Sequence, residues 1–109
     1  MSGYDDFESY TVVVYQQERP AGAPDLDEDG RRELLAGHRA FLAEMRAAGE
    51  LLHNGRFVGG GGLCFYACDV EKTRALVQRD PYLIVGDREV EIYTWQCPPG
   101  VVSFNTERN

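Results

Sequence analysis

Two segments of the chain carry apolar or aromatic side chains at both odd and even positions, and they constrain the fold most. They are residues 9–17 (SYTVVVYQQ) and residues 63–68 (LCFYAC). Successive side chains of a strand point to opposite faces, so Phe65 lies on one face of the second segment and Tyr66 on the other. We therefore expect both segments to be strands in a sheet that is covered on both faces.

The strongest helical pattern lies between these two segments, in residues 25–48. Leu34, His38, Phe41 and Met45 recur there at three- and four-residue spacing, which is typical of one helix face. Aspartates at the start of this stretch are suitable N-caps, and a glycine follows its end. The pattern predicts an amphipathic helix whose inner face carries one histidine.

Three further elements complete the predicted order. Residues 50–57 form a short strand, residues 70–79 form a second helix that ends at Asp80 and Pro81, and residues 89–96 form a last alternating strand. The resulting βαββαβ order predicts an α+β fold with a ferredoxin-like sheet and two helices on one face. Two helices cover only one face, so we expect a second copy of the sheet to cover the other, in a homodimer.

Composition limits the size and the partners of the protein. The 109 residues suit a single domain (1–109), with a core over about 8–97 and an irregular tail over 98–109. The net charge of −7 argues against nucleic-acid binding, which requires a basic surface. We find no signal-peptide pattern and no membrane-spanning apolar run, and three cysteines without disulfide spacing suit reduced thiols. The expected location is the cytoplasm.

His38 and Asp80 are the two candidate catalytic residues. His38 faces inward, either as a buried neutral histidine bonded to a backbone carbonyl or as a general acid or base. Asp80 is either a local helix-ending residue or the orienting partner of the histidine. In a split βαβ unit the two helices lie side by side, so the carboxylate could fix the tautomer of the imidazole.

Four other residues are candidates for substrate binding, each with a structural alternative. Tyr66 and Trp95 could form the floor of a pocket, or they could belong to the core or to the dimer interface. His53 could line the pocket or face solvent. Arg56 could hold an anionic group of the substrate, or it could be a surface arginine.

Neither a metal site nor a phosphate site is predicted. Cys64 and Cys68 would lie roughly 13 Å apart along a strand, too far to share one ion. The glycines of residues 59–62 lack the Lys-Ser/Thr pair and the strand-to-helix context of a P-loop, so we interpret them as a hairpin connection.

Three stretches resemble the YciI-like family (also called YCII or DGPF-related). They are residues 37–55 (GHRAFLAEMRAAGELLHNG), residues 70–86 (VEKTRALVQRDPYLIVG) and residues 89–95 (EVEIYTW). The resemblance implies a dimeric α+β barrel, an active site at His38 and Asp80, and chemistry without a metal or organic cofactor. The chain departs from the family pattern at residues 55–57 (GRF), where a Gly-Pro-Leu is frequent, and in its glycine-rich loop and longer acidic insert.

Together these features favour an enzyme of small-molecule metabolism, with natural-product assembly as one setting. His38, oriented by Asp80, would transfer a proton on a cyclic or aromatic substrate, in an elimination, isomerisation or cyclisation by a lyase or isomerase. Two alternatives remain open at this point: a non-catalytic small-molecule-binding or dimerisation module, and a cofactor-free monooxygenase.

Overall fold

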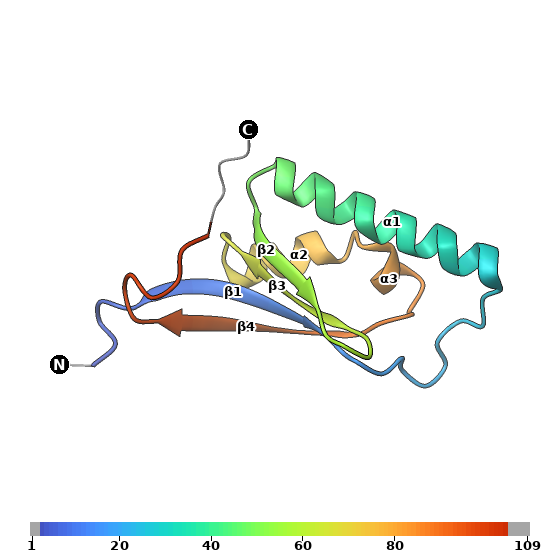
Figure 1. Cartoon of the computed structure of the whole chain (residues 1–109), viewed down its shortest axis with the longest axis horizontal. Helices are drawn as coiled ribbons and strands as arrows, with labels where there is room; N and C mark the ends of the chain where they lie inside the picture. The colour runs from blue at the N-terminus through green and yellow to red at the C-terminus, as the bar shows by residue number, and fades with distance from the viewer. Residues whose placement is uncertain (1–2, 105–109) are drawn as a thin grey trace.

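The computed structural model describes residues 3–104, and its elements alternate in the predicted order. Four strands form one antiparallel sheet in the order β2-β3-β1-β4, and the helices lie together on one side of it (Figure 1). The α+β class and the βαββαβ order are confirmed, with one additional short helix. The elements are β1 Glu8–Tyr15, α1 Glu28–Ala47, β2 Leu51–Arg56, β3 Gly62–Tyr66, α2 Val70–Val77, α3 Pro81–Ile84 and β4 Val90–Cys97.

Aspartate caps define where the two longer helices begin. The Asp27 carboxylate accepts a hydrogen bond from the Gly30 amide at the start of α1, and Asp69 accepts one from the Lys72 amide at the start of α2. Each cap satisfies an N–H group that has no partner within the helix. Gly49 follows α1 with a φ of +78°, a conformation that favours glycine and ends the helix.

The helix α3 was not predicted. We expected the second helix to end at Asp80 and Pro81, but residues Pro81–Ile84 form one further helical turn. Asp80 caps this turn, because its side chain accepts a hydrogen bond from the Tyr82 amide at 3.0 Å. Proline suits the first position of a helix, where its missing N–H costs nothing.

The core lies between the helices and one face of the sheet. Val13, Tyr66 and Val77 are fully buried there, and Phe41 and Met45 reach it from α1. The pairing of β1 with β3 places Val13 opposite Cys64 and the next inward residue, Tyr15, opposite Gly62. This register brings the Tyr15 side chain to the end of the sheet that lies near α3.

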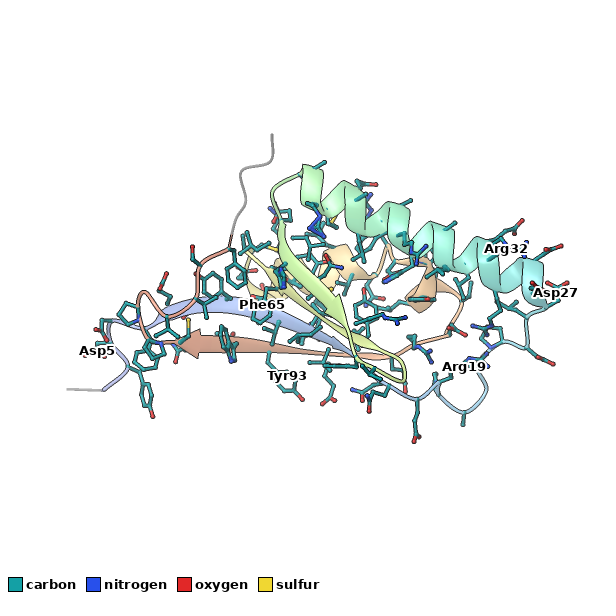
Figure 2. All side chains as sticks on the ribbon, in the orientation of Figure 1. Asp5, Arg19, Asp27, Arg32, Phe65 and Tyr93 are labelled. Atoms are coloured by element: carbon teal, nitrogen blue, oxygen red, sulfur yellow. The ribbon has the colours of Figure 1, made fainter. Side chains whose placement is uncertain are left out.

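The other face of the sheet is apolar and has little cover within residues 3–104. Figure 2 shows Tyr93 pointing away from the helices, and 49% of its surface is exposed. Phe65 and Trp95 share this face, with ring centroids 5.2 Å apart. The segment after β4 contributes Phe104, which lies 5.2 Å from Phe65. Helices and tail together therefore leave much of this face open.

Residues 98–104 form neither helix nor strand, as expected for the tail, and residues 105–109 lie outside the described part of the chain. None of the helices in residues 3–104 is long and apolar enough to cross a membrane.

Candidate active site

A cleft of about 420 Å³ opens between α1, the β2–β3 hairpin and the segment after α3. The helix α1 contributes His38 and two leucines to its lining, and Tyr15 and Tyr82 form part of its inner wall. A volume of this size suits a small-molecule ligand.

The structure places His38 and Asp80 in direct contact. The Nδ1 atom of His38 lies 2.8 Å from Oδ2 of Asp80. The Asp80 side chain is fully buried, and that of His38 retains 14% exposure, on the side of the cleft. The contact arises because α1 packs on α3, whose first turn Asp80 caps.

Three donors surround the Asp80 carboxylate. Besides His38, the Tyr15 hydroxyl donates to Oδ2 at 2.6 Å, and the Tyr82 amide donates to Oδ1. Burial raises the pKa of Tyr15 far above its ordinary value, and the negative charge of Asp80 raises it further. The phenol therefore stays protonated and acts as a donor. An ionised carboxylate only accepts hydrogen bonds, so it is suited to accept one from the N–H group at Nδ1 of His38.

Two aromatic rings hold the imidazole in place. The Tyr82 ring lies against it at a centroid distance of 4.2 Å and an interplanar angle of 31°. The Tyr15 ring meets it edge-on at 5.4 Å. Within residues 3–104, the Nδ1 atom is bonded to Asp80, and Nε2 makes no hydrogen bond to protein. Nε2 is therefore the nitrogen available to a ligand, and the alternative of a bond to a backbone carbonyl is not observed.

The four predicted substrate-binding residues do not share one site within the chain. Arg56 lines the cleft beside His38. Tyr66 faces the helices but is fully buried in the core and does not line the cleft, and its hydroxyl has no hydrogen-bond partner in the described residues. His53 and Trp95 lie on the opposite face of the sheet, at a second hollow of about 560 Å³.

A β-bulge explains the position of His53. Regular alternation would put Leu51 and His53 on the same face of β2, but the register shifts between them. His53 consequently pairs with Phe65 on the open face, and Asn54 turns towards the cleft. Bulges leave no clear trace in a single short strand sequence, so sequence analysis could not identify Asn54 as a lining residue.

The glycine-rich loop forms one wall of the cleft as a hairpin connection, as predicted. Gly61 has a φ of +75°, and a Cβ atom there would lie 2.8 Å from the Gln16 carbonyl oxygen and closer still to that of Tyr15. A Cβ on Gly60 would lie 2.9 Å from the Gln17 carbonyl oxygen. Real Cβ atoms do not approach so closely, so glycine is required for the loop to pack on the end of β1.

Cysteine and metal chemistry receive no support from the described residues. Burial, and secondarily the charge of Asp80, raise the pKa of the Cys64 thiol to about 12, so it is protonated and unreactive at neutral pH. In residues 3–104, no group of three or more histidine, cysteine or acidic side chains is arranged to hold a metal ion.

The sheet, the helix layer and the open second face define the protomer architecture of the dimeric α+β barrel fold. One solved structure with this fold is the 5-chloro-2-hydroxyhydroquinone dehydrochlorinase TftG from Burkholderia phenoliruptrix AC1100, in complex with 2,5-dihydroxybenzoquinone. It aligns with a TM-score of 0.58 and 18% sequence identity, over 78% of this chain and 92% of that chain. At this identity the similarity shows the fold alone. No family model and no curated protein matches the sequence, so membership of the YciI-like family stays a prediction.

Proposed function

We propose that the protein is an enzyme that transfers a proton on a small cyclic or aromatic substrate bound in the cleft. His38 is the general base and acid, and Asp80 orients it. The observation that carries this proposal is the imidazole itself: Nδ1 is bonded to a buried carboxylate, while Nε2 is free beside the cleft. A histidine held in this way is the usual arrangement for proton transfer near neutral pH.

The reaction begins with Nε2 accepting a proton from a carbon or hydroxyl of the substrate. Asp80 stabilises the imidazolium that forms and keeps Nδ1 protonated throughout, as the orienting acid does in catalytic triads. In an isomerisation or cyclisation the proton then returns to another atom of the substrate. In an elimination the electron pair of the broken C–H or O–H bond expels the leaving group as an anion, and His38 releases its proton to solvent. A positioned acid–base residue contributes roughly 10²- to 10⁴-fold to the rate.

Among these outcomes we favour elimination, with isomerisation as the alternative. TftG is a dehydrochlorinase, so its name describes the loss of hydrogen chloride, and its bound ligand is a single six-membered ring. The cleft of about 420 Å³ accommodates a molecule of that size. The side chains of Leu35, Leu42 and Tyr82 supply apolar wall area beside the imidazole.

We further propose that two copies of the chain pair through the open face of the sheet. Phe65, Tyr93 and Trp95 form an aromatic patch there that the helices do not cover. Exposed apolar patches of this kind are typical of interaction sites. A second sheet packed on the first would also account for the aromatic side chains on both faces of β3.

The test uses a panel of chlorinated and hydroxylated single-ring compounds, with chloride release and product formation measured for four forms of the protein. These are the wild type, His38→Asn, Asp80→Asn and the matched control His53→Asn, which alters a histidine on the opposite face. We expect turnover to fall at least about 100-fold in the two site variants and to persist in the control. A folded His38→Asn variant with full turnover would rule out the mechanism. Binding without any turnover in the wild type would favour the alternative of a non-catalytic binding module.

A further inference from the structure

The charges around the cleft differ from those of the whole chain. The chain has eighteen acidic and eleven basic residues, yet the cleft is lined by Arg39, Arg56 and Arg88 and by no aspartate or glutamate. Asp80 lies behind His38 and is occupied by its own donors. The cleft beside His38 is thus lined by three positive charges, which favour the approach of anions.

Arg88 differs from the other two arginines in its burial. Its Nη1 atom is buried without a hydrogen-bond partner among the described residues. The neighbouring Asp87 forms no ion pair with it among the described residues: Arg19 at 3.0 Å and Arg31 at 2.8 Å both bind Oδ1 of Asp87, and Oδ2 is buried without a partner. A buried donor without a partner is costly, and such groups in native proteins usually bind water, an ion or a ligand.

The position of Arg88 places this charge near the reacting nitrogen. Its Nη2 atom lies 3.9 Å from where a Cβ on Gly60 would be, so the guanidinium sits beneath the glycine loop. Burial raises the pKa of Tyr82, and the positive charge of Arg88 opposes that rise, as expected for neighbouring groups. Tyr82 in turn stacks on the imidazole of His38. The ring of a ligand that lies over Tyr82 can therefore contact both Arg88 and His38.

Two further lining side chains have free donors. Arg56 lies on the exposed rim of the cleft and makes no ion pair within residues 3–104. Asn54 accepts a hydrogen bond from Arg46 through Oδ1, which fixes the amide and leaves its NH₂ group as a donor. The glycine loop offers fewer free N–H donors, because the Gly60 amide already donates to the Phe57 carbonyl within the turn.

We propose that the substrate is a single-ring carboxylic acid whose carboxylate binds Arg88 and is completed by Arg56 at the mouth of the cleft. The planar fork of a guanidinium matches a carboxylate with two parallel hydrogen bonds. A phosphate group would need more donors than the partly occupied loop amides provide. This inference rests on the proposed function, since it assigns the substrate class of the same site.

The experiment compares the binding of 2,5-dihydroxybenzoate with that of 2,5-dihydroxybenzamide by isothermal titration calorimetry. The two probes have the same ring and differ in the charge of one group. The variants are Arg88→Gln, Arg56→Gln and the control Arg74→Gln, which changes an exposed arginine on α2 away from the cleft. We expect the wild type and Arg74→Gln to bind the acid at least about tenfold more tightly than the amide, and Arg88→Gln to lose this preference.

Equal affinity for acid and amide in the wild type, or no binding of either probe at millimolar concentration, would overturn the proposal. So would an acid preference that survives both Arg88→Gln and Arg56→Gln. If Arg88→Gln does not fold, Arg56→Gln is the deciding variant, because Arg56 is exposed. We expect it to reduce the preference for the acid over the amide by about threefold or more. The preference for the acid is a binding measurement that needs no turnover, and it should persist in His38→Asn. A failed carboxylate proposal can therefore be told apart from a failed proton-transfer mechanism.

Discussion

Replacing Gly61 by alanine tests whether the glycine loop is held against β1 as the structure shows. An alanine there would have to adopt a φ of +75° and place its Cβ 2.8 Å from the Gln16 carbonyl oxygen. The left-handed conformation costs about 1 to 2 kcal/mol for a residue other than glycine. Overpacking against backbone that cannot move aside adds about 1 to 3 kcal/mol.

Gly59→Ala is the matched control for this change. Gly59 also has a positive φ, +100°, but a Cβ there would meet nothing within 4 Å. The control therefore carries the conformational strain without the steric overlap. We expect Gly61→Ala to lower the free energy of unfolding by about 1 to 3 kcal/mol more than Gly59→Ala.

Equilibrium unfolding in urea, followed by circular dichroism, measures both variants under the same conditions. If both variants show the same dependence of unfolding free energy on urea and Gly61→Ala has the lower midpoint, the result supports packing of the loop on β1. If the two variants unfold at the same urea concentration, the loop does not pack on the end of β1, and the shape of the cleft described above is wrong.

Three further changes test other parts of the structure. Tyr15→Phe removes the donor to Asp80 and should cost about 1.5 to 3 kcal/mol in urea unfolding. Because the folded-state pKa of Tyr15 is raised, the wild type should lose stability as the pH rises above about 10, and this variant should lose less. Burial raises the pKa of Asp87, but hydrogen bonds from two arginines lower it more, so its stabilisation is lost as the pH falls through that lowered pKa. Asp87→Asn should therefore show a flatter loss of stability below about pH 4 than the wild type. Phe65→Asp should convert a dimer to a monomer in sedimentation velocity, and a wild type that is a stable monomer at micromolar concentration would contradict the proposed pairing.

Much of the architecture could be predicted because it depends on strong periodic patterns. The inner stripe of α1 contains His38, Phe41 and Met45, and the structure buries the latter two in the core. The apolar character of both faces of β3 predicted cover on both; within residues 3–104 the helices cover one face, and cover of the other by a second copy stays a prediction. The short helix α3 was missed, since its capping by Asp80 requires a backbone geometry that composition does not encode.

The site was predicted only in part, for physical reasons that differ between residues. A contact between His38 and Asp80 was a possibility from the order of the helices, and the structure makes it where α1 packs on α3, a helix that was not predicted. The contribution of Tyr15 depends on the exact register of β1 against β3, which a single sequence does not specify. Arg88 follows a turn and lies in neither a helix nor a strand, so no periodic pattern identified it as a residue of the cleft.

Whether Asp80 orients His38 is tested most directly by the tautomer of His38, measured from the ¹⁵N chemical shifts of its ring in the wild type and in Asp80→Asn. Asp69→Asn, which alters the N-cap of α2, is the control. If Asp80 holds the imidazole for proton transfer, neutral His38 carries its proton on Nδ1 in the wild type and in the control. It should shift to the Nε2-protonated form in Asp80→Asn, because the new amide donates where the carboxylate accepted. A wild-type His38 protonated on Nε2, or the same tautomer in all three proteins, would contradict the account.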